Sequence, residues 1–175
     1  MKKIVISLLL LFFSFHLSAQ TDYLEPVKPL DTYPGELGEY YRNVFSLLSA
    51  DFQPQPYARF IVIPSFSPEY AMSVEKKNGR YCLISNTLSR TYWQAEKGTV
   101  KSEKKSVFIS QSLYLSLGAI FRLATGQIQD LDGSSAGLDG VVYYFASTDS
   151  KGNILSGRKW SPKKGTLMER LVLVC

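Results

Sequence analysis

A valine- and aromatic-rich run at residues 141–146 constrains the fold more than any other part of the chain. Its sequence, VVYYFA, is the most strand-like in the protein. Valine, tyrosine and phenylalanine alternate onto both faces, which is typical of an interior strand with both faces covered. We therefore expect the rest of the chain to pack around this strand, with a glycine-rich loop before it and a Trp160-Ser161-Pro162 corner after it.

The first 19 residues have the pattern of an export signal. Two lysines precede an apolar run at residues 4–13, and a small-residue cleavage site ends at Ala19. The run is too short to be a preferred transmembrane segment, and no cysteine follows the site to carry a lipid. We expect cleavage after Ala19 and a periplasmic or extracellular protein with no stable membrane span. The alternative is an uncleaved anchor.

The mature chain has the size of one domain and is only mildly basic. Removing 19 of the 175 residues, two lysines among them, leaves 156 residues and lowers the formal charge from +5 to +3. That length suits one domain. The remaining lysines are spread in short pairs, as on solvated faces, so we expect no nucleic-acid partner. Proline-rich residues 20–34 are expected to form an extended arm before a single domain at 35–175.

Hydrophobic periodicity predicts an α+β domain with two or three helices against a mostly antiparallel sheet of about four to six strands. Helices are expected at 36–50, at 110–126 with Ser110 as N-cap and Gly126 as C-cap, and after a Thr166/Glu169 capping box. Strands are expected at 58–63, 70–76, 80–86, 141–147 and from 154, with Asn78-Gly79 as a hairpin turn. Residues 88–95 fit a strand or an irregular aromatic segment, and residues 98–105 a turn.

Histidine chemistry is excluded from the mature chain. The single histidine, His16, lies inside the predicted signal peptide. Serine or cysteine nucleophiles activated by histidine, and imidazole metal ligands, are therefore absent. Residues 133–137 spell G-x-S-x-G, but they lack both the histidine and the preceding strand of a hydrolase elbow, so we expect a turn. A serine–lysine hydrolase would need no histidine, but its Ser-x-x-Lys motif occurs four times in this small chain and is therefore unspecific.

Carboxylates offer two further alternatives. Asp130, Asp132 and Asp139 share one loop, and calcium prefers oxygen ligands, but the rest of an EF-hand ligand set is missing. Glu36 and Glu39 form a close pair in sequence, and a glycosidase needs two carboxylates across a cleft. Neither pattern specifies a site, so we predict no catalytic, cofactor-binding or metal-ligating residues.

Two cysteines, Cys82 and Cys175, remain after signal removal. Export places them where disulfides form, and a bridge would close a long loop. Two separate buried thiols are the alternative.

Aromatic residues are the positive functional feature. The mature chain holds all eleven tyrosines and both tryptophans. Most can fill a core, but tyrosine and tryptophan also suit partner or glycan surfaces. The candidate binding surface consists of Tyr92, Trp93, Tyr143, Tyr144 and Trp160.

Three motifs resemble a family of small exported bacterial proteins of unknown function. They are PSFSPE at residues 64–69, LDG with YYF at 138–145, and GxxWSP at 157–162. The resemblance covers roughly residue 58 to the C-terminus. Its motifs are structural, and the family has no assigned activity, so the resemblance implies an exported protein and transfers no catalytic role to any residue.

Together these patterns favour a non-enzymatic binding or interaction protein of the cell envelope, with an envelope protein or a glycan as partner. The alternative is a small enzyme that uses carboxylate, lysine or tyrosine groups without histidine.

Overall fold

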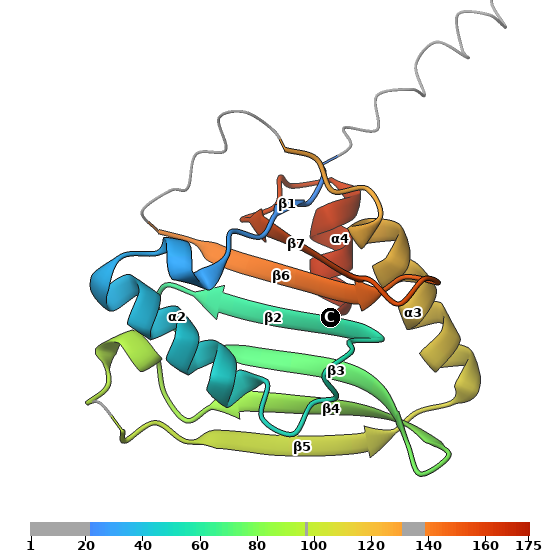
Figure 1. The fold of residues 1–175 in the computed structure, drawn as a ribbon, viewed down its shortest axis with the longest axis horizontal. Coiled ribbons are helices and arrows are strands. Elements are labelled where there is room, and N and C mark those ends of the chain that lie inside the picture. The colour runs from blue at the N-terminus through green and yellow to red at the C-terminus, as the bar shows by residue number, and fades with distance from the viewer. Residues whose placement is uncertain (1–21, 97, 131–138) are drawn as a thin grey trace, which may run out of the picture. The chain divides into compact units, whose positions relative to one another are not determined.

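The computed structural model describes residues 22–96, 98–130 and 139–175. They have the predicted α+β fold, built on one antiparallel sheet (Figure 1). The sheet has seven strands, in the order β1-β7-β6-β2-β3-β4-β5, rather than the four to six expected. The strands are β1 (Glu25–Pro26), β2 (Ala58–Pro64), β3 (Tyr70–Lys77), β4 (Arg80–Leu88), β5 (Ser102–Phe108), β6 (Val141–Thr148) and β7 (Ile154–Trp160).

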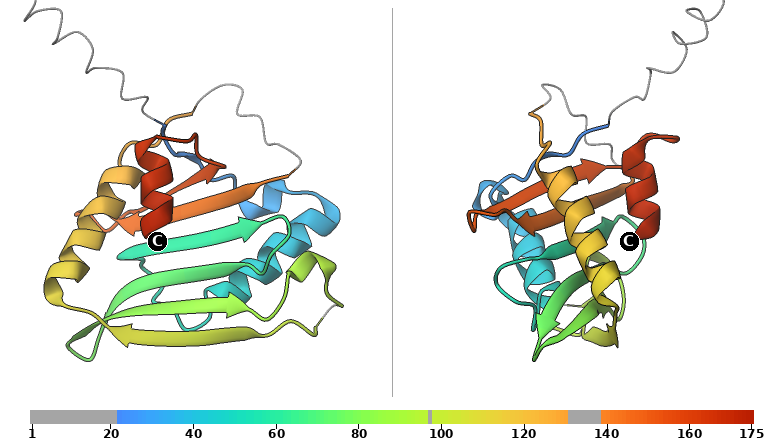
Figure 2. Two further views of the ribbon diagram at one scale, coloured as in Figure 1. Left: turned by 180° about the vertical axis from the view of Figure 1, so that it is seen from behind. Right: turned by 90° about the vertical axis from the view of Figure 1, so that its right-hand side faces the viewer.

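Two helices cover opposite faces of this sheet (Figures 1 and 2). The helices of the described residues are α2 (Gly35–Leu48), α3 (Gln111–Thr125) and α4 (Leu167–Val174), with short 3-10 helices η1 (Leu30–Thr32) and η2 (Tyr92–Gln94). Helix α2 crosses one face, and α3 crosses the other. Both faces of the central strands are therefore buried.

Strand β6 is the interior strand that the VVYYFA run predicts. It lies between β2 and β7, and Phe145 pairs with Phe60 of β2. Its side chains alternate as expected for a strand covered on both faces. The Tyr144 ring lies 5.0 Å from Phe45 of α2, whereas the Phe145 ring lies 5.6 Å from Phe121 of α3.

The predicted hairpin between β3 and β4 is confirmed. Asn78 and Gly79 have positive φ angles of 50° and 77°. Two consecutive positive φ values are the requirement of a type I′ turn, whose twist matches that of the strands. The turn sets the register in which Lys77 pairs with Arg80.

Both outer strands of the sheet were missed by the sequence patterns. Strand β5 occupies part of 98–105, where we expected a turn. It was missed because its Ser-Glu-Lys-Lys-Ser run lacks the apolar residues of a buried face. Charged residues are suited to an edge strand, since they discourage pairing with other chains. Strand β1 lies in the expected arm and pairs Glu25 with Arg158 of β7. Its two residues are too few to give a periodic signal.

Helix α3 forms where the sequence predicts it. The Ser110 hydroxyl accepts a hydrogen bond from the Leu113 N–H at 3.1 Å, which confirms the N-cap. Gly118 lies so close to the Tyr57 ring that a Cβ atom would collide with it, so this glycine permits close packing. Gly126 is the C-cap, but with φ −76° it is right-handed rather than left-handed.

Residues 162–174, with Asp22, belong to a separate compact unit. The Thr166 hydroxyl accepts from the Glu169 N–H at 3.2 Å, and the Glu169 carboxylate accepts from the Gly165 N–H at 2.6 Å. In a capping box the two residues bond each other's N–H groups. Here the glutamate accepts from the N–H of Gly165, one residue before Thr166, and the other bond is as expected. The predicted C-terminal helix is therefore confirmed as α4.

Candidate functional site

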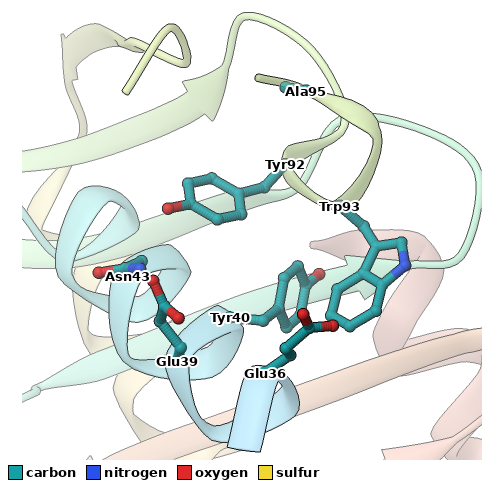
Figure 3. Close-up of a pocket in the computed structure, with 7 residues that line it drawn as sticks. All are labelled: Glu36, Glu39, Tyr40, Asn43, Tyr92, Trp93 and Ala95. Atoms are coloured by element: carbon teal, nitrogen blue, oxygen red, sulfur yellow. The ribbon is translucent and has the colours of Figure 1, made fainter. Parts of the chain in front are cut away.

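A pocket of about 150 Å³ opens between helix α2 and the 3-10 helix η2 (Figure 3). We call it the α2/η2 pocket. One wall carries polar side chains of α2, and the other carries rings of η2. Its lining residues are Glu36, Glu39, Tyr40, Asn43, Tyr92, Trp93 and Ala95.

Glu69, a fully buried carboxylate, ties the two walls of the pocket together. It precedes β3 and has 0% exposure. The Tyr40 hydroxyl donates to Glu69 Oε1 at 2.7 Å, and the Tyr92 N–H donates to Oε2 at 3.0 Å. One carboxylate thus fixes a side chain of α2 and the first residue of η2. Hydrogen bonds to a charged acceptor are stronger than neutral ones, so this carboxylate links the two walls firmly.

The pocket rings meet edge to face. The Tyr40 ring centroid lies 5.1 Å from Trp93, at an interplanar angle of 77°. It lies 5.9 Å from Tyr92, at 63°. Such tilted contacts are the preferred geometry of aromatic pairs. Trp93 nevertheless remains 57% exposed, so the pocket presents a large indole surface to solvent.

The pocket's electrostatic character is acidic. Glu36 and Glu39 line it, and no lysine or arginine belongs to its described lining. Burial, and then the hydrogen bond to Glu69, raise the pKa of Tyr40 far above its ordinary value. The Tyr40 hydroxyl therefore stays protonated and remains a donor to Glu69. Exposed carboxylates, the Asn43 amide and aromatic faces are the groups that the pocket offers to a ligand.

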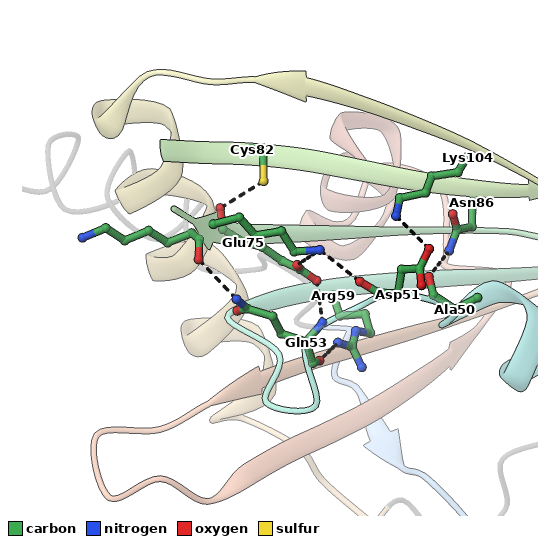
Figure 4. A network of polar contacts seen from close by, with 10 residues as sticks. Ala50, Asp51, Gln53, Arg59, Glu75, Cys82, Asn86 and Lys104 are labelled. Carbon is green, nitrogen blue, oxygen red and sulfur yellow. Dashed lines mark hydrogen bonds and ion pairs between the residues drawn. The ribbon is translucent and has the colours of Figure 1, made fainter. Parts of the chain in front are cut away.

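A second polar network fixes the C-terminal end of α2 (Figure 4). The buried Asn86 amide donates to the carbonyls of Leu48 and Ala50, both at 2.9 Å. Leu48 is the last residue of α2, so its carbonyl has no partner within the helix, and Ala50 follows just after the helix. Asn86 thus satisfies a group that the helix end leaves open and ties down the chain that follows. Helix α2 is held at one end by Asn86 and at Tyr40 by Glu69.

The five residues of the predicted binding surface do not form one cluster. Tyr92 and Trp93 come together in the α2/η2 pocket. Tyr144 is only 6% exposed, beneath α2. Tyr143 points to the other face, where its ring stacks 5.8 Å from Phe60, and Trp160 packs against the backbone of Gly140.

The two cysteines are free thiols in this structure. Cys82 is buried on β4, and its Sγ lies 3.5 Å from the Glu75 carbonyl as a weak donor. Burial raises the pKa of Cys82, and it raises the pKa of Cys175 to about 12. Both groups are therefore poor nucleophiles at neutral pH.

Other predicted sites lie partly outside the described residues. The G-x-S-x-G run and Asp132 of the calcium alternative belong to residues 131–138, which the structure does not describe. Within the part that it describes, no three histidine, cysteine, aspartate or glutamate side chains gather as metal ligands. No helix of that part is long and apolar enough to cross a membrane.

Sequence patterns missed Glu69 and Asn43 and did not connect Tyr40 with Tyr92. Glu69 stands at the end of the PSFSPE motif, and its burial depends on a contact with Tyr40, 29 positions earlier in the chain. The usable signal was the glutamate immediately before an apolar strand, where a charge is unexpected.

No family model, curated protein or solved structure matches the chain. The resemblance to small exported bacterial proteins therefore stays a prediction.

Proposed function

We propose that the chain is an exported, non-enzymatic binding protein of the cell envelope, and that the α2/η2 pocket binds a saccharide. The observation that carries the proposal is the buried Glu69 carboxylate, which fixes Tyr40 and η2 in place before any ligand arrives. A preorganised site loses less conformational entropy on binding. Burying a carboxylate costs free energy, and the bonds that hold the pocket walls together account for its presence here.

The groups at the pocket surface suit a sugar ring. The exposed Trp93 indole offers a flat apolar face for the C–H side of the ring. Glu36, Glu39 and Asn43 offer acceptors and a donor for hydroxyl groups. A few polar groups beside aromatic walls are the usual composition of a small-ligand site.

The enzyme alternative rests on the same carboxylates. Glu36 and Glu39 both line the pocket, as a glycosidase pair would. They lie three residues apart on α2, however, and therefore project from the same wall. A glycosidase needs carboxyl groups on opposite sides of the bond that it cleaves. This arrangement favours binding over hydrolysis.

Tryptophan fluorescence tests the proposal. In a Trp160→Phe variant, Trp93 is the single tryptophan of the mature chain. We expect N-acetylglucosamine oligomers, or another member of a panel of bacterial envelope saccharides, to change its emission in a saturable manner. Trp93→Ala should abolish binding measured by calorimetry, whereas Phe108→Ala, which removes an exposed ring outside the pocket, should not.

Two outcomes would overturn the proposal. Choline, a cation without a sugar ring, could bind the pocket while every saccharide fails. Alternatively, release of nitrophenol from nitrophenyl glycosides, lost in Glu36→Gln, would establish the enzyme alternative.

A further inference from the structure

A second cavity, of about 200 Å³, lies beneath the C-terminal half of α2. We call it the Arg59 cavity. It is bounded by α2, the loop before β2, and strands β2, β6 and β7. Most of its lining is apolar, and the lining includes Val27, Phe45, Pro54, Ile61, Tyr144 and Ile154.

Arg59 is the one charged residue of the cavity's described lining. One of its terminal nitrogens donates to the Gln53 carbonyl, and the guanidinium lies 5.2 Å from the centroid of the Phe52 ring. Its Nε is buried and has no hydrogen-bond partner among the described residues. Burial lowers the pKa of Arg59, opposed by the charge of Glu75, but arginine keeps its proton in proteins.

A buried N–H without an acceptor is uncommon in folded proteins. In a partly apolar cavity, the acceptor that gains most is an anionic oxygen, because charge-assisted bonds strengthen as water is excluded. The guanidinium fork matches a carboxylate in shape as well as charge. The cavity therefore combines an apolar space with an anion-recognising group at its wall.

We propose that the Arg59 cavity binds a small amphiphilic carboxylate, with the apolar chain inside and the carboxylate accepting from Arg59. The volume is appropriate, since a dry cavity of about 150 Å³ accommodates a benzene ring. The site is separate from the α2/η2 pocket, and it goes beyond the proposed saccharide binding.

Three probes with the same eight-carbon alkyl chain but different head groups separate recognition of charge from burial of apolar surface. We expect octanoate to bind, in isothermal titration calorimetry, at least tenfold more tightly than 1-octanol, and octylamine to bind more weakly than either. Equal affinity of octanoate and 1-octanol, or no binding of octanoate, would overturn the proposal.

Two variants locate the binding. Arg59→Gln should reduce octanoate affinity to that of 1-octanol. If this variant does not fold, Ala146→Leu gives an independent test, because Ala146 lines the cavity and the larger side chain fills it. Ala146→Leu should abolish binding of both probes, and octanoate binding that survives it would contradict the assignment. Trp93→Ala should leave octanoate affinity unchanged, so failure here and failure of saccharide binding are distinguishable.

Discussion

Glu69 and Glu75 are buried carboxylates at the two ends of the same strand region, but their surroundings differ. Glu69 has 0% exposure and accepts from the Tyr40 hydroxyl and the Tyr92 N–H, two neutral donors. Glu75, 1% exposed, forms an ion pair with Lys77 at 2.9 Å and accepts from the Gln53 N–H at 2.9 Å (Figure 4). Glu69 is bound by neutral donors alone, whereas Glu75 is bound by one neutral donor and one cation.

The two carboxylates organise different parts of the molecule. Glu69 joins α2 to η2, so its bonds position the walls of the α2/η2 pocket. Glu75 fixes Gln53, whose carbonyl in turn accepts from Arg59 of the Arg59 cavity. Each candidate site is thus supported by one buried carboxylate, and the two supports can be removed separately.

Glu69→Ala should have the largest effect. It leaves the Tyr40 hydroxyl and the Tyr92 N–H buried without an acceptor, which we expect to lower the free energy of unfolding by about 3 kcal/mol. Urea denaturation measures this loss. Glu69→Gln keeps one acceptor oxygen and should lose less. A loss below about 1 kcal/mol for Glu69→Ala would mean that these bonds do not hold the pocket walls.

Lys77→Met should have an intermediate effect. It leaves Glu75 buried without its cation, but Lys77 is 38% exposed, so the pair is partly screened. We expect a loss of about 1 to 2 kcal/mol, below the range for a fully buried pair. Adding Glu75→Gln should recover part of the loss, which a double-mutant cycle measures.

Lys104→Met is the matched control for Lys77→Met. It removes an exposed ion pair with Asp51 at 2.9 Å. Its melting temperature should match that of the wild type. If both lysine variants behave alike, the burial of Glu75 does not strengthen its pairing.

Among the changes that act on Glu75, lowering the pH should change the free energy of unfolding least. Burial opposes its charge, but the Gln53 N–H and Lys77 overcome this and lower the pKa of Glu75. Its contribution to stability is therefore complete above its unfolded pKa, about 4.3, and is lost as pH falls through the lower folded value. Urea denaturation across this pH range measures the free energy of unfolding. It should fall less steeply with decreasing pH in Glu75→Gln than in the wild type. An unchanged slope would contradict the lowered pKa.

Local rules recovered the interior of the fold. The VVYYFA run, the Asn78-Gly79 turn and the Ser110 cap each act through neighbouring residues, and each appears as predicted. Strand β5 has no apolar periodicity because its side chains are exposed on both faces, so sequence patterns could not reveal it.

The candidate site was only partly predictable. Tyr92 and Trp93 were identified by residue type, but Tyr143 and Tyr144 could not be separated, because neighbours on a strand point to opposite faces. Glu69 was missed because its function depends on contacts that only the folded chain creates. Residue type indicates what a side chain can bind, whereas topology decides which side chains meet.

The pairing of β2 with β6 has a consequence for how the protein is made. Strand β2 pairs on one side with β3, which follows it directly, and on the other with β6, where Pro64 pairs with Val141. The second of these neighbours becomes available only when most of the chain has been synthesised. Strands β3, β4 and β5 can join in sequence as they emerge. Until β6 arrives, however, the apolar run from Phe60 to Ile63 has an open edge, which is a template for aggregation. The half-made chain therefore needs shielding that the finished protein does not.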